Sequence, residues 1–153
     1  MDKQAKKNEQ EVNEDISPYK ILIIDDDMWI QRLFSKYLVE WGFRPLSAYD
    51  PYEGIAMAVK HQPLMIFLDV IMPDVQGEIL LKMLKTIEQT SDIPVYVVSG
   101  NFNKELLAEM YKHGAMGFLS KPFSQKLIYD AIIKSLPKEI TEKLQETTFQ
   151  IIE

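Results

Sequence analysis

The sequence contains no cysteine, which excludes disulfide bonds and metal sites built on thiolates. It also has no apolar run close to the roughly 18 residues that a transmembrane helix needs. Its first residues are polar and lack the apolar core of a secretory signal peptide. Basic residues are fewer than acidic residues: the chain has 17 Lys and Arg and 23 Asp and Glu, which gives a net charge of -6. This balance argues against direct binding to nucleic acid or to an anionic membrane, and we expect a cytoplasmic protein.

What is present is an ordinary globular composition, with 46% hydrophobic and 26% charged residues in 153 residues. That length suits one domain with a sizeable core. Residues 1–17 are polar and charged, and we expect a disordered tail. Residues 18–136 hold the regular elements and form the expected domain. Residues 137–153 carry apolar side chains on one helical stripe, which predicts a C-terminal helix or a linker.

Apolar runs alternate with amphipathic segments along the expected domain. Strands are predicted at 19–24, 44–49, 64–68, 94–99 and 116–120, and helices at 28–40, 52–61, 78–89, 104–113 and 124–135. The runs 19–24 and 64–68 are apolar throughout, as in parallel strands that are buried on both faces. This order predicts an α/β fold, a doubly wound five-stranded parallel sheet with helices on both faces.

Polar side chains stand at the carboxyl ends of four predicted strands. They are Asp25, Asp26 and Asp27 after the first strand, Asp69 after the third, Ser99 at the fourth and Lys121 after the fifth. Because the carboxyl ends of parallel strands meet at one edge of the sheet, we expect these groups to converge. Adjacent carboxylates repel one another and resist ionisation, so a cation is expected to offset them. Mg²⁺ suits a few carboxylates combined with water and a phosphate oxygen.

The segments IIDDD, LDVIMPDVQG, VVSG and GAMGFLSKPF resemble the signature segments of bacterial response-regulator receiver domains. The resemblance covers about residues 19–136 and includes the separations between the segments. It implies a flavodoxin-like (βα)5 fold and a phosphoacceptor role in a two-component phosphorelay. A histidine kinase or a histidine phosphotransfer protein would donate the phosphoryl group, and an output partner that the sequence does not identify would read the state.

The resemblance also implies a role for each matching residue. Asp69 would be the phosphoacceptor. Mg²⁺ would be bound by Asp26, by Asp69 and by the main-chain carbonyl of Ile71, with Asp25 acting largely through water.

Ser99 and Lys121 would contact the phosphoryl group, and Ser99 together with Phe118 would form the switch. The resemblance further implies that the peptide bond between Lys121 and Pro122 is cis. The residues that would shape the loops are Pro73, Gly77 and Pro122.

Other classes fit the residues less well. A Mg²⁺-dependent aspartyl-phosphate phosphatase would need a second aspartate two residues after Asp69, where Ile71 stands. A flavodoxin-like cofactor carrier would need a phosphate-binding loop after the first strand, and Asp25–Asp27 would repel phosphate. We therefore expect a protein that catalyses only its own phosphorylation and dephosphorylation and is not otherwise an enzyme. A stand-alone receiver and a receiver fragment of a larger multidomain regulator both stay open.

Three residues have a simpler structural interpretation. Asp27 is expected to begin a helix, and His61 and His113 are expected at helix C-termini, where a positive charge is favoured. Neither histidine has a second histidine or a cysteine at the spacing of a metal site.

Overall fold

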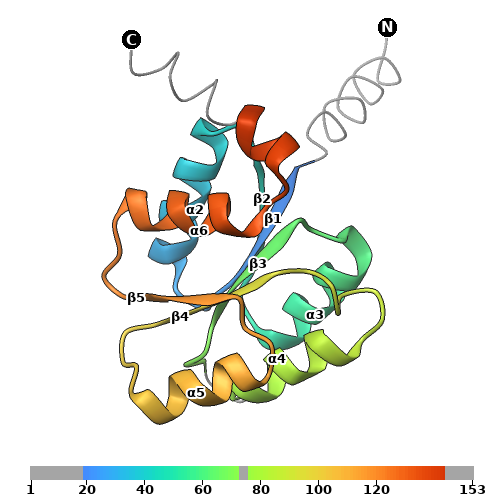
Figure 1. The fold of residues 1–153 in the computed structure, drawn as a ribbon, viewed down its shortest axis with the longest axis vertical. Helices are drawn as coiled ribbons and strands as arrows, with labels where there is room; N and C mark the ends of the chain where they lie inside the picture. The colour runs from blue at the N-terminus through green and yellow to red at the C-terminus, as the bar shows by residue number, and fades with distance from the viewer. Residues whose placement is uncertain (1–18, 73–75, 144–153) are drawn as a thin grey trace, which may run out of the picture.

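The structure is a computed structural model that describes residues 19–72 and 76–143, in which strands and helices alternate (Figure 1). The strands are β1 (Lys20–Ile24), β2 (Arg44–Ala48), β3 (Met65–Asp69), β4 (Val95–Ser99) and β5 (Gly117–Ser120). The helices are α2 (Met28–Glu40), α3 (Pro51–His61), α4 (Gly77–Thr86), α5 (Lys104–Lys112) and α6 (Gln125–Ser135). The predicted alternation is confirmed, with small shifts at the boundaries.

All five strands belong to one parallel sheet in the order β2-β1-β3-β4-β5. The chain runs from β1 outward to β2, passes back over β1 to β3, and then continues outward to β5. The winding direction therefore reverses between β1 and β3. In doubly wound sheets the carboxyl ends of the strands at such a reversal form a crevice. The predicted fold class is confirmed, and its crevice lies where the sequence concentrates aspartates.

Each face of the sheet carries its own apolar core. Within β1, Ile21 and Ile23 belong to the core that includes residues of α2 and α6. Leu22 and Ile24 belong to the core that includes residues of α3, α4 and α5. Figure 1 shows these two groups of helices on opposite sides of the sheet. Alternate residues of one strand face opposite sides, which explains why the strand is apolar throughout.

The segment after α6 is helical over residues 138–143. Ile140 packs against the core that α2 and α6 share. The rest of the expected C-terminal segment and the expected N-terminal tail lie outside the described residues. None of the helices in residues 19–72 and 76–143 is long and apolar enough to cross a membrane.

Helix α4 ends earlier than its sequence pattern predicts, at Thr86 rather than near residue 89. Ile87 has extended backbone angles (φ -68, ψ 125) and leaves the helix. The buried hydroxyl of Thr90 donates a hydrogen bond to the carbonyl oxygen of Leu84 at 2.6 Å. This side chain satisfies a carbonyl group that would otherwise need another helical turn.

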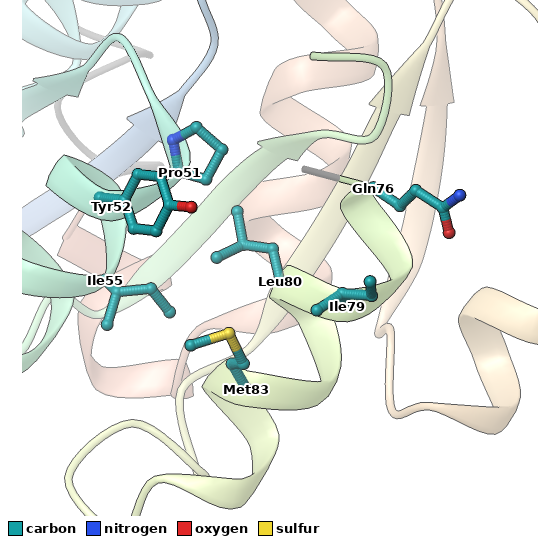
Figure 2. A pocket seen from close by; sticks show the side chains of 7 residues that line it. All are labelled: Pro51, Tyr52, Ile55, Gln76, Ile79, Leu80 and Met83. Carbon is teal, nitrogen blue, oxygen red and sulfur yellow. The ribbon is translucent and has the colours of Figure 1, made fainter. Parts of the chain in front are cut away.

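Helix α4 buries Leu80, Leu81 and Leu84, whereas its apolar residues Ile79 and Met83 are 47% and 43% exposed. The two exposed residues line an apolar hollow of about 390 Å³ between α3 and α4. Figure 2 shows Tyr52 of α3 on the side of this hollow opposite Met83. No carboxylate from the ends of β1 and β3 lines it.

Candidate functional site

The carboxyl ends of β1 and β3 carry a cluster of aspartates. Asp25 directly follows β1 and Asp69 is the last residue of β3. The register that pairs Ile24 with Leu68 brings these two strand ends side by side. Asp25, Asp26 and Asp69 each place one carboxylate oxygen within 4.8 Å of the others. The structure thus brings together the carboxylates that the sequence places at two separate strand ends.

Lys121 reaches this cluster from the segment after β5. Its Nζ atom lies 3.1 Å from Oδ2 of Asp25 and 3.6 Å from Oδ2 of Asp69. The backbone N–H of Lys121 donates a hydrogen bond of 2.8 Å to the carbonyl oxygen of Ser99, which ties this segment to the end of β4. The Lys121–Pro122 peptide bond is cis, as predicted.

Backbone amides hold one oxygen of each buried aspartate. The N–H of Asp27 donates to Oδ1 of Asp25 at 2.8 Å, and the N–H of Ile71 donates to Oδ1 of Asp69 at 3.0 Å. The second oxygen of each side chain is the one that faces Lys121. Asp27 is the N-cap of α2 and its carboxylate accepts from the N–H of Trp29, which confirms the prediction that it begins a helix.

The electrostatics of the cluster are unfavourable for two ionised carboxylates. The pKa of Asp69 is raised to about 6, mainly by burial and also by the charges of Asp25 and Asp26, against the opposing effects of the Ile71 N–H and Lys121. Burial likewise raises the pKa of Asp25. Burial opposes the charge of Lys121, but Asp69 and Asp25 outweigh it and raise the pKa of the amine. One ammonium therefore does not fully compensate the buried carboxylates.

Gln31 is a buried residue of the site region that the sequence interpretation missed. Its Nε2 atom lies 3.0, 3.1 and 2.9 Å from the carbonyl oxygens of Ile23, Asp25 and Ala48, which share its two N–H donors. These contacts fasten α2 to the ends of β1 and β2, and one of them holds the peptide unit between the first two aspartates. The sequence does contain an indication of this role, because Gln31 is a polar residue at helical spacing from Phe34 on the buried face of α2.

The two predicted switch residues lie in different environments. Ser99 is fully buried at the end of β4, where its Oγ accepts a hydrogen bond of 3.1 Å from the N–H of Asn101. Phe118 is 39% exposed. Its ring centroid lies 5.2 Å from that of Phe102 and 6.5 Å from that of Tyr111, both in edge-on contacts. Phe118 therefore packs with surface aromatic residues and not inside the acidic crevice.

The loop after β3 has a tight approach at Gly77, the first residue of α4. A Cβ atom at this position would overlap the backbone of Val70, so the helix begins where only glycine fits. Ile71, in the same loop, is 58% exposed and forms an isolated bridge with Gln76. Pro73 lies outside the described residues.

The donor set of the crevice fits Mg²⁺. Its three clustered side chains offer only carboxylate oxygens, the ligands that this hard cation prefers. Burial and the neighbouring carboxylates raise the pKa of Asp69, and burial raises that of Asp25, so their ionised forms are disfavoured in the folded protein. A divalent cation bound among these oxygens would supply positive charge and favour the ionised carboxylates.

A five-stranded doubly wound sheet with paired acidic strand ends and a converging lysine is the architecture of a receiver domain. A family model described as the response regulator receiver domain matches residues 21–133. The chain therefore belongs to the response regulator receiver domain family of two-component signalling.

Solved and curated relatives agree with this assignment. The structure of the chemotaxis protein CheY4 of Vibrio cholerae has a TM-score of 0.74 and 28% sequence identity, and covers 77% of this chain and 98% of that chain. Sporulation initiation phosphotransferase F of Bacillus subtilis is 29% identical over 118 residues, which are 77% of this chain and 94% of that protein.

The DNA-binding dual master transcriptional regulator RpaA of Synechocystis is 38% identical over 104 residues, which are 68% of this chain and 43% of that protein. The chain spans about half the length of the first curated relatives that it matches, with shares of 43%, 56% and 58%.

Proposed function

We propose that Asp69 accepts a phosphoryl group from the phosphohistidine of a histidine kinase or a histidine phosphotransfer protein. Its Oδ2 would attack the phosphorus while the bond from phosphorus to the imidazole nitrogen breaks, and the electron pair of that bond stays with the nitrogen. The observation that carries the proposal is the orientation of this buried carboxylate. One oxygen is held by the N–H of Ile71, and the other lies 3.6 Å from the amine of Lys121.

The surrounding groups would neutralise charge, since phosphoryl transfer depends mainly on positioning and electrostatic stabilisation. Asp25, Asp26, Asp69 and the carbonyl group of Ile71 would hold Mg²⁺, with Asp25 acting largely through water. The cation would offset the charge of the phosphoryl oxygens and of the carboxylates. Lys121 is close enough to exchange part of its contact with Asp69 for a phosphoryl oxygen.

The hydroxyl group of Ser99 would donate a hydrogen bond to the phosphoryl group and so move from its present contact with Asn101. That movement would leave space for Phe118 to turn inward, which changes the surface that a partner contacts. The net charge of -6 favours a protein as the output partner over nucleic acid. We infer that the chain acts in the cytoplasm and turns over no substrate other than its own phosphoryl group.

The test is phosphorylation by acetyl phosphate with Mg²⁺, followed by intact-mass measurement. Wild type should gain the mass of one phosphoryl group, and Asp69→Ala should gain none. Asp92→Ala is the matched control, because this exposed aspartate lies in the loop before β4 and should label as wild type does. Equal labelling of Asp69→Ala and wild type would overturn the assignment.

A further inference from the structure

A second group of metal-ligand side chains lies between α4 and α5, which are neighbours below the sheet in Figure 1. Glu78 comes from the first turn of α4, Glu109 from α5, and His113 caps the C-terminal end of α5. Each offers one ligand atom, and the three atoms lie within 4.8 Å of one another. All three side chains are partly buried, with exposures of 32%, 46% and 17%. None of them belongs to the acidic crevice.

The imidazole of His113 has a carboxylate from each helix as a neighbour. Nε2 of His113 lies 3.1 Å from Oε1 of Glu78 and 3.3 Å from Oε2 of Glu109. A single proton on Nε2 gives a well-directed hydrogen bond to only one acceptor. Two carboxylate oxygens nevertheless approach the same nitrogen atom, one from each helix.

The same spacing suits a tetrahedral cation. Bonds of about 2.0–2.1 Å from Zn²⁺ to nitrogen and oxygen place neighbouring tetrahedral ligands about 3.3 Å apart. The two distances from Nε2, 3.1 and 3.3 Å, are close to that separation. Glu109 and His113 are also four residues apart on one face of α5, a spacing that lets two side chains of one helix meet at one point.

We propose that Glu78, Glu109 and His113 form a three-ligand site for Zn²⁺ that fastens α4 to α5. An imidazole nitrogen with two carboxylate oxygens is a donor set that Zn²⁺ accepts and that Mg²⁺ does not prefer. Lys82 lies 3.3 Å from Oε1 of Glu78, but its side chain is 50% exposed and can turn into solvent when the cation binds. Three protein ligands leave a fourth position for water or for a ligand atom of a partner.

The site escaped sequence inspection because Glu78 lies 35 residues from His113, and only the packing of the two helices joins them. Phe118 of β5 contacts the ring of Tyr111 on α5. A cation that fixes α5 to α4 would therefore restrain a helix that packs against Phe118.

The test is calorimetric titration of the full chain with Zn²⁺ in excess Mg²⁺, which competes with Zn²⁺ for the carboxylates of the acidic crevice. Changing the supporting partners of metal sites typically weakens binding by about 10–100-fold, so loss of a ligand should weaken binding at least about tenfold. His113→Gln and Glu109→Gln should both show this loss. His61→Gln and Glu105→Gln are the matched controls, since they change the other histidine of the chain and an exposed glutamate of α5.

Wild type and both controls should bind one equivalent of Zn²⁺. Circular dichroism of each variant separates loss of the ligand from loss of the fold. Absence of binding by wild type, equal binding by His113→Gln, or a matching loss in His61→Gln would each overturn the proposal. This result is independent of whether Asp69 accepts a phosphoryl group.

Discussion

Replacing Asp69 by asparagine should stabilise the protein when Mg²⁺ is absent. Burial and the neighbouring carboxylates raise the pKa of Asp69 from 3.8 to about 6. An increase of this size corresponds to about 3 kcal/mol of unfavourable free energy for the ionised side chain in the folded state. Asparagine carries no charge and so avoids this unfavourable free energy, but Lys121 loses its ion pair with residue 69. We therefore expect a net gain in unfolding free energy of about 1–2 kcal/mol for Asp69→Asn at neutral pH.

The gain should depend on pH in a defined direction. Because the pKa of Asp69 is higher in the folded than in the unfolded protein, the unfolded chain releases this proton first as pH rises. The contribution of Asp69 to wild-type stability therefore falls between about pH 3.8 and pH 6 and is constant above that window. Asp69→Asn lacks this titration, so its advantage should be small below the window and reach its full size above it.

Urea denaturation with a chelator, followed by fluorescence of the buried Trp41, measures the difference at each pH. Added Mg²⁺ should stabilise wild type and have little effect on Asp69→Asn, because a ligand that binds the folded state raises its stability. If the variant is no more stable than wild type at neutral pH with a chelator, the electrostatic account of the crevice is wrong. A stability difference that is constant from acid to neutral pH would contradict it equally.

Three further changes probe the surroundings of the crevice. Ile71→Asn should speed the loss of the phosphoryl group about tenfold, or roughly 1.4 kcal/mol in barrier, because the side chain of Ile71 cannot hydrogen-bond and orient an attacking water, whereas an amide can; equal decay after donor removal would contradict this. Gln31→Met should lower the unfolding free energy by about 1–3 kcal/mol, because three carbonyl groups lose a donor; unchanged urea denaturation would show that the contacts are not stabilising. Phe118→Tyr should reduce the inward population seen by relaxation-dispersion NMR, because a phenol adds a polar group to bury; identical populations would remove the idea.

The fold could be predicted from the sequence because the strands are short and apolar throughout and the helices are amphipathic. Such patterns constrain element type and the parallel sheet, and β1 and β3 lie where the pattern placed them. The convergence of Asp25, Asp69 and Lys121 was predictable for the same reason, since parallel strands end at a common edge.

What the sequence could not provide depends on packing between distant segments. The buried face of α4 is turned so that Leu81 enters the core and Met83 does not, because neighbouring elements decide which residues of an apolar helix are covered. The end of α4 depends on the hydroxyl group of Thr90, a contact beyond the helix itself. The periodicity of apolar residues within α4 therefore predicts neither which of its residues are buried nor where the helix ends.

The central claim is that the phosphoryl group resides on Asp69. Borohydride reduction of the phosphorylated protein converts a phosphoaspartate to homoserine, and peptide mass spectrometry then locates the change. The phosphoryl donor in this experiment should be a phosphorylated histidine phosphotransfer domain, with Mg²⁺ present. We expect the reduced residue at position 69 and at no other aspartate. Reduction at Asp25 or Asp26, or stable label on a histidine instead, would contradict the account.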